Sequence, residues 1–146
     1  MRLNAKVRDV MTPNPIFSTP DATVESVARL MANTNCGEIP ICKDGKVVGI
    51  VTDRDVTCRT VARGVNPSLA KANDIMTLLP VTIYADDPLR KAIEVMEQEA
   101  VRRLPVVDAN GVMVGILSQV DVAVRASQRK AGHLLAAVRP LPLAKL

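Results

Sequence analysis

Aromatic residues are almost absent from this 146-residue chain. It has no Trp, one Phe (Phe17) and one Tyr (Tyr84), although 48% of its residues are hydrophobic. A core must therefore be built from Val, Ile, Leu, Met and Ala. The length suits one compact domain that buries enough surface to fold without metals or disulfides.

Histidine and cysteine are also scarce. Cys36, Cys42 and Cys58 are odd in number and form no Cys-x-x-Cys pair, and His133 is the only histidine. A structural zinc site needs four such ligands, so we expect no metal site. No nucleophile–base pair is visible either, so we expect no enzyme and no required cofactor. We predict that the cysteines are buried thiols in a reducing compartment.

Long apolar runs are missing as well. None approaches the roughly 20 residues that a membrane helix needs, and the first residues contain no apolar segment typical of a signal peptide. We therefore expect a cytoplasmic protein with no membrane partner.

Acidic residues are absent from 122–146, where five basic residues lie. The other 14 basic and 15 acidic residues give residues 1–121 a charge of −1, so the net charge of +4 belongs to the tail. A basic tail can contact nucleic acid or anionic lipid. Single-strand binding also uses stacking aromatics, which this tail lacks, so a solvated helix end is the favoured interpretation.

An internal repeat of about 65 residues organises the chain. Three segments of the first copy match the second, with one extra residue in the second turn. The pairs are Val10-Met11-Thr12 with Ile75-Met76-Thr77, Ile39-Pro40-Ile41 with Leu104-Pro105-Val106, and Gly49, Thr52 and Asp55 with Gly115, Ser118 and Asp121. We predict a first repeat at 1–65, a second repeat at 66–125, and a basic C-terminal helix end and tail at 126–146.

Each copy predicts the element order β-α-β-β-α. The first strands are expected at Ile16–Ser18 and Val81–Ile83, and the first helices, with Asp21 or Asp86-Asp87 as caps, follow the 3.6-residue spacing of their apolar residues. The next strands are expected at Ile39-Pro40-Ile41 and Leu104-Pro105-Val106, and their internal prolines suggest that they lie at sheet edges. They are followed by the hairpin signals Asp44-Gly45 and Asn110-Gly111. The expected fold is α/β (α+β), with two repeats packed with pseudo-twofold symmetry.

A hydroxyl residue and an aspartate recur where a buried strand meets a helix in each copy. Thr52-x-x-Asp55 and Ser118-x-x-Asp121 place both side chains at a helix N-terminus, where backbone N–H groups favour an anion. The same spacing also predicts a capping box, in which the two side chains satisfy the helix end themselves. Both interpretations can hold, with a ligand replacing the cap.

These paired segments resemble the cystathionine-β-synthase (CBS) domain family, arranged as a stand-alone tandem pair (a Bateman module) of the hypoxic response protein type. The resemblance covers about residues 7–125. It implies a non-catalytic regulatory module that binds an adenosine-containing ligand (AMP, ADP, ATP or S-adenosylmethionine) in a cleft between the repeats. It also implies a homodimer, and a shape or partner affinity that changes on binding.

The resemblance also implies site residues, and the two copies differ there. Aspartates would accept ribose hydroxyls, hydroxyl residues would donate to phosphate or ribose, arginines would hold phosphate, and aliphatic residues would hold adenine. The favoured second site comprises Ser118, Asp121, Arg103, Arg102, Ile116 and Val81; the weaker first site comprises Thr52, Asp55, Arg54, Ile50 and Ile16.

Where the second copy has Arg102-Arg103, the first has Gly37-Glu38. A carboxylate repels phosphate, so we expect the first site to be weaker, empty or suited to a cationic ligand, although Arg54 could partly offset Glu38. Two alternatives remain. One is a ligand-free structural or dimerisation module; the other is weak nucleic-acid binding through the basic tail.

Overall fold

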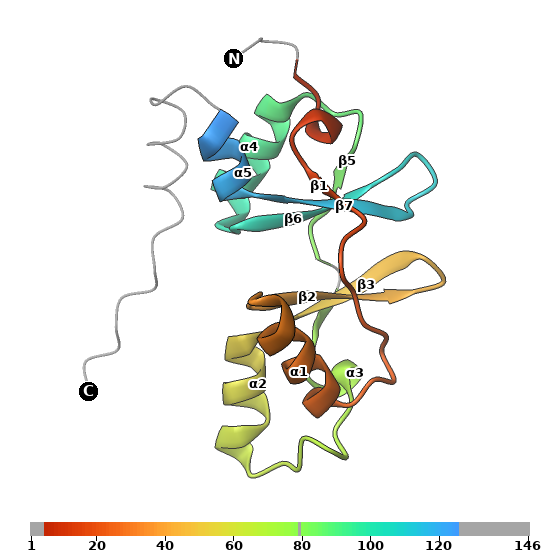
Figure 1. Ribbon diagram of the computed structural model, residues 1–146, viewed down its shortest axis with the longest axis vertical. Helices are drawn as coiled ribbons and strands as arrows, with labels where there is room; N and C mark the ends of the chain where they lie inside the picture. Colours follow the sequence, from red (N-terminus) through yellow and green to blue (C-terminus); the bar gives the residue numbers. More distant parts are fainter. Residues whose placement is uncertain (1–4, 79, 126–146) are drawn as a thin grey trace, which may run out of the picture. The chain divides into compact units, whose positions relative to one another are not determined.

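The computed structural model describes residues 5–78 and 80–125, and Figure 1 shows their helices and strands. Within these residues the chain forms two 3₁₀ helices, five α-helices and seven strands. In chain order they are η1 (Val7–Asp9), β1 (Thr12–Pro13), α1 (Val24–Thr34), β2 (Glu38–Lys43), β3 (Lys46–Thr52), α2 (Asp53–Arg59), η2 (Val61–Arg63), α3 (Ala72–Ile75), β4 (Thr77–Leu78), β5 (Ile83–Tyr84), α4 (Leu89–Glu99), β6 (Arg103–Val107), β7 (Met113–Ser118) and α5 (Gln119–Arg125). The expected mixed α/β fold with two repeats is confirmed.

The chain divides into two compact units. The Thr52 unit is Ile16–Pro80, and the Ser118 unit combines Met1–Pro15 with Val81–Leu146. Each unit therefore contains the body of one repeat and the short segment that leads into the other repeat. The lead-in of the first repeat (residues 5–15) supplies β1 to the Ser118 unit, and the lead-in of the second (residues 72–78) supplies β4 to the Thr52 unit.

The Thr52 unit has a three-stranded sheet in the order β2-β3-β4, with both pairs antiparallel. α1 contacts β2 and α2 contacts β3, and both helices cover the same face of the sheet (Figure 1). The core beneath them is aliphatic, and no aromatic residue takes part in it. Its fully buried residues include Val24, Val27, Ile41 and Val51.

The Ser118 unit has a four-stranded sheet in the order β1-β7-β6-β5, in which only β5 and β6 run parallel. α4 contacts β6 and α5 contacts β7 (Figure 1). Val7 and Val10 of the lead-in are buried in this core together with Ile83 and Leu89. The backbone of Val7 also donates to Asp87 O at 3.0 Å, so the lead-in is an integral part of this unit.

The hairpin turns form where the sequence predicts them. Asp44 and Gly45 both have positive φ values, 52° and 78°, as a two-residue type I′ turn requires. The second turn is one residue longer: Gly111 has φ 79°, and Asp108 Oδ1 accepts the N–H groups of Asn110 and Val112.

Three local expectations are wrong. Ile16–Ser18 forms only an isolated bridge from Ser18 to Ile41, and the matching strand β5 begins at Ile83 instead of Val81. β2 does lie at a sheet edge, but β6 lies between β7 and β5. β6 can hold an internal proline because its pairing with β5 begins only at Val106. β5 therefore requires no N–H from Pro105.

The third wrong expectation concerns the caps of α1 and α4. Thr23 caps α1 by accepting the Ser26 N–H, and Pro88 is the N-cap of α4 without a side-chain bond. Asp86 pairs instead with Lys6 and Arg8 of the lead-in. The hydrogen bond from Lys6, aided by the charge of Arg8, lowers the pKa of Asp86.

Candidate functional site

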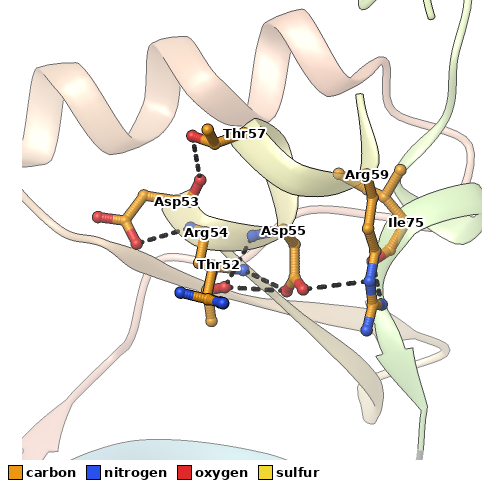
Figure 2. A network of polar contacts seen from close by, with 7 residues as sticks. All are labelled: Thr52, Asp53, Arg54, Asp55, Thr57, Arg59 and Ile75. Atoms are coloured by element: carbon orange, nitrogen blue, oxygen red, sulfur yellow. Dashed lines mark hydrogen bonds and ion pairs between the residues drawn. The ribbon is translucent and has the colours of Figure 1, made fainter. Parts of the chain in front are cut away.

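The junction of β3 and α2 holds a closed network of polar contacts around Asp55 (Figure 2). Thr52 ends the strand and is the N-cap of the helix. Its N–H and its hydroxyl donate to Asp55 Oδ2 at 2.9 and 3.0 Å, and Asp55 N–H donates back to Thr52 Oγ1 at 3.1 Å. Asp53 N–H donates to Gly37 O and Arg54 N–H to Asp53 Oδ1, so the first N–H groups of the helix have partners without a ligand.

The junction of β7 and α5 repeats these bonds. Ser118 N–H and its hydroxyl donate to Asp121 Oδ2 at 2.8 and 2.6 Å, and Asp121 N–H donates to Ser118 Oγ at 3.1 Å. The capping-box interpretation is therefore confirmed in both units. The ligand-binding role of the same side chains remains a prediction, and a ligand would have to exchange with these bonds.

The segments Gly49–Asp55 and Gly115–Asp121 each begin with a glycine, because the side chain of a methionine lies over that position. A Cβ at Gly49 would lie 2.5 Å from Met76 Sδ and 3.0 Å from Thr77 O. A Cβ at Gly115 would similarly collide with Met11 Sδ. The lead-in methionines therefore pack against the motif strands, an arrangement that the sequence analysis did not predict although both Met-Thr pairs are part of the repeat.

Strand register brings the charge difference directly to the two capping boxes, the Thr52 box (Thr52 and Asp55) and the Ser118 box (Ser118 and Asp121). Arg103 is the cross-strand partner of Ser118, and Glu38 is the partner of Thr52. Opposed residues in antiparallel strands have Cβ atoms about 5 Å apart, so each charged residue is adjacent to its box. The preceding residues are also close, because Asp53 N–H donates to Gly37 O and Gln119 N–H donates to Arg102 O, both at 2.9 Å.

The five matched positions around each box differ in formal charge by three units. The Thr52 box carries −2 and the Ser118 box +1 at neutral pH. The positions are Gly37, Glu38, Asp53, Arg54 and Asp55 in the first copy, and Arg102, Arg103, Gln119, Val120 and Asp121 in the second.

The predicted adenine-contacting residues are of two kinds. Ile50 and Ile116 are half-buried in β3 and β7, two residues before the hydroxyl of each box. Ile16 and Val81 lie outside strands and are 48% and 37% exposed. Apolar surface is thus available at all four positions, with Ile50 and Ile116 on the same strands as the boxes.

Arg59 is a further candidate site residue, which the sequence analysis missed. It ends α2 one helical turn after Asp55, and its Nε lies 3.5 Å from Asp55 Oδ1. Its Nη1 also donates to Ile75 O at 2.7 Å. The i,i+4 spacing of Asp55 and Arg59 is a signal that could have identified the pair.

The cysteines do not share one environment. Cys42 is buried, and burial raises the pKa of its thiol to about 11. Cys36 is half-buried and its thiol donates to Glu38 O at 3.1 Å. Cys58 is exposed on α2, so the expectation that all three are buried is wrong for this residue.

In the part of the chain that the structure describes, no helix is both long and apolar enough to cross a bilayer. Within residues 5–78 and 80–125, no group of three or more His, Cys, Asp and Glu residues could hold a metal ion. The basic tail and His133 lie outside the described residues.

Comparison with known proteins defines the class. The CBS domain model matches residues 7–59 and 72–127, so the chain belongs to the CBS domain family and contains a tandem pair. It is 35% identical over 132 residues to the CBS domain-containing protein YhcV of Bacillus subtilis, covering 90% of this chain and 93% of YhcV. A match to the inosine-5'-monophosphate dehydrogenase of Thermoplasma acidophilum, at 34% identity, covers only 27% of that enzyme.

Solved structures give the same class. Hypoxic Response Protein I, determined with two coordinated zinc ions, has a TM-score of 0.77 and 28% identity, covering 84% of this chain and all of that one. Hypoxic response protein 1 of Mycobacterium tuberculosis is 30% identical to this chain over 117 residues. CBSX2 of Arabidopsis thaliana in complex with AMP has a TM-score of 0.72 and 30% identity, covering 86% and 98%. The CBS pair of MJ0100, in complex with 5'-methylthioadenosine and S-adenosyl-L-methionine, has a TM-score of 0.72 and 25% identity, covering 83% and 94%. The expected CBS-pair family is confirmed.

Proposed function

We propose that the protein is a non-catalytic sensor that binds an adenosine-containing nucleotide at the Ser118 box. The observation that carries this proposal is the strand register, which puts Arg103 opposite Ser118, the residue whose N–H and hydroxyl donate to the Asp121 carboxylate. A carboxylate accepts ribose hydroxyls, while an arginine fork and a helix N-terminus suit phosphate. The box and its neighbours therefore offer complementary groups for both polar parts of a nucleotide.

Each side chain of this site has a proposed role. Asp121 accepts the ribose hydroxyls and Ser118 donates to ribose or phosphate, replacing the bonds of the capping box. Arg103 and Arg102 bind phosphate. Ile116 and Val81 pack against adenine, for which no aromatic side chain is needed.

The Thr52 box is proposed as the weaker site for a phosphorylated ligand. Glu38 is opposite Thr52, where Arg103 is opposite Ser118. At about 4 Å the repulsion between a carboxylate and a phosphate charge is about 1 kcal/mol in water and larger where water is partly excluded. Arg54 follows Asp53 in this box and offsets part of that repulsion.

Two structural relatives support the choice of ligand class. CBSX2 was determined with AMP, and the CBS pair of MJ0100 with 5'-methylthioadenosine and S-adenosyl-L-methionine. All three ligands share adenine and ribose and differ in the group that the 5' carbon carries. We therefore propose AMP, ADP or ATP for the arginine-bearing Ser118 box.

Calorimetric titration of AMP into the wild type and into Asp121→Ala and Asp55→Ala variants tests the proposal. We expect Asp121→Ala to weaken AMP binding by about 10- to 100-fold, because a hydrogen bond to a charged group contributes about 1.5–3 kcal/mol. Asp55→Ala should change it by less than about threefold. Since both changes remove equivalent capping bonds, each variant controls for the other, and equal losses would contradict the proposed asymmetry.

A ligand-free structural or dimerisation module is the second candidate function. The closed bonds of both boxes favour it, because neither helix end needs a ligand. The proposed homodimer is compatible with both candidates. Thermal unfolding with AMP, ADP, ATP and S-adenosylmethionine separates them: a ligand of the folded state raises the unfolding temperature, and no shift with any of the four favours the structural role.

A further inference from the structure

The carboxylate of Asp55 has protein partners on both of its oxygens. Oδ2 accepts the N–H and the hydroxyl of Thr52, while Oδ1 is 3.5 Å from Nε of Arg59 (Figure 2). The Asp55 side chain is only 12% exposed. A ribose diol, which needs the same oxygens, must therefore displace groups that belong to the protein.

Arg59 is held in this place by a second anchor. Its Nη1 donates to Ile75 O at 2.7 Å, at the end of α3 (Figure 2). Ile75 directly precedes Met76, whose side chain lies over Gly49. The guanidinium thus joins the carboxylate to the segment that leads into the second repeat. Because two contacts fix a planar fork, moving it away from Asp55 costs more than breaking a single exposed ion pair.

We propose that Arg59 closes the Thr52 box and determines which ligand can use it, an inference that rests on the proposed function. The arginine balances the charge of Asp55 from within the chain, so the box has less need of a cationic ligand. Glu38 still opposes phosphate. The ligand class that remains is an uncharged nucleoside such as adenosine, which enters only when Arg59 moves away.

The role proposed for Arg59 applies to the Thr52 box alone. The repeat places Arg125 at the position that matches Arg59, but the side chain of Arg125 lies outside the described residues. The experiment must therefore silence the Ser118 box first. Asp121→Ala does so by removing the proposed ribose acceptor of that box.

The test is calorimetric titration of adenosine into Asp121→Ala and into the same protein with Arg59→Met. We expect Arg59→Met to tighten adenosine binding at least about threefold, because the nucleoside no longer competes with an ion pair. Adding Asp55→Ala should abolish the gain. Arg63→Met is the matched control, since it removes the same charge from the exposed 3₁₀ helix η2 and should leave affinity unchanged.

Unchanged or weaker adenosine binding by a folded Arg59→Met protein would overturn the inference. If that variant does not fold, the NMR signal of the Arg59 Nε–H in Asp121→Ala decides: we expect it to shift as adenosine is added, and a constant signal at saturation, or no adenosine binding at all, refutes the inference. AMP titration of the wild type tests the proposed function separately. If the wild type binds AMP but Arg59→Met leaves adenosine binding unchanged, the role of Arg59 is wrong and the proposed function stands.

Discussion

Asp55 and Asp121 each combine a structural and a proposed binding role in one carboxylate. Each accepts two bonds from its own hydroxyl residue, and such a cap is typically worth about 1 kcal/mol. A ligand that takes over the carboxylate must compensate for these bonds. The binding free energy at each box is therefore the free energy gained from ligand contacts less the free energy needed to break the capping bonds.

The glycine of the Thr52 motif gives a prediction about single residues. Gly49→Ala should destabilise the protein by about 1–3 kcal/mol, because its Cβ would overlap Met76, whose Sδ is only 2.5 Å away. Met76→Ala alone should cost about 2–5 kcal/mol as a large-to-small core change. The double variant should cost at least about 1 kcal/mol less than the sum, since removing Met76 makes room for the new methyl group. Urea unfolding of the three variants measures this coupling.

Gly64→Ala is the matched control for that cycle. Gly64 has φ 65° and no atom within 4 Å of an added Cβ, so its substitution is strained only by conformation, at about 1–2 kcal/mol. Its cost should add to that of Met76→Ala within about 0.5 kcal/mol. Additive costs for Gly49 and Met76 as well would show that their contact does not explain the glycine.

Sequence spacing predicted both boxes because a capping box is local: its atoms lie within four consecutive residues. The i,i+4 spacing of Asp55 and Arg59 is also local and was overlooked. The second partner of Arg59 could not be predicted, because Ile75 O is 16 residues away and is a backbone atom, which no side-chain motif reveals. The contact of Gly49 with Met76 was missed for a similar reason. The glycine was visible in the repeat, but the side chain that requires it comes from the other copy.

The lead-in segments are the elements whose placement the sequence did not reveal. The repeat assigns Val7 to the first copy, but Val7 is buried in the Ser118 unit. Periodicity finds helices and strands within a copy, whereas the partner of a short segment depends on which core has room for it. The repeat limits at residues 65 and 125 therefore remain a prediction about the sequence, separate from the compact units.

Substitution of two valines of the first repeat tests whether its lead-in packs in the Ser118 unit. Val7 and Val24 are both fully buried, but Val7 packs in the Ser118 unit and Val24 in the Thr52 unit. Val7→Ala should cost about 2 kcal/mol and lower the hydrogen-exchange protection of β6 and β7. Val24→Ala should have a similar cost but act on β2 and β3. Loss of protection in β2 and β3 by Val7→Ala would contradict the assignment of the lead-in.

At the scale of the described chain, the two copies share an order of elements but carry opposite local charge around their boxes. The fold, the family and the difference between Glu38 and Arg103 could all be predicted from the sequence, because the repeat aligns the two copies residue by residue. The register adds that each of these residues is directly opposite its hydroxyl. Charge at one strand position, on a common frame, is therefore the feature that would give one chain two unequal sites.

Exchanging those two residues tests whether their charge alone sets the preference. In Glu38→Arg with Arg103→Glu, AMP should move from the Ser118 box to the Thr52 box, because the phosphate follows the guanidinium. The net charge stays at +4, so long-range attraction of the anion is unchanged and cannot explain a shift. Adding Asp55→Ala or Asp121→Ala to the exchanged protein identifies the occupied box by calorimetry.

The single variants define how complete the exchange should be. Arg103→Glu alone should weaken AMP binding by about 10- to 100-fold, through loss of a charge-assisted bond and gain of repulsion. Glu38→Arg alone should create a second AMP site, weaker than the first because Arg59 still occupies Asp55. If AMP in the exchanged protein still depends on Asp121 and not on Asp55, local charge at this strand position does not select the box, and the apolar residues beside each box would have to.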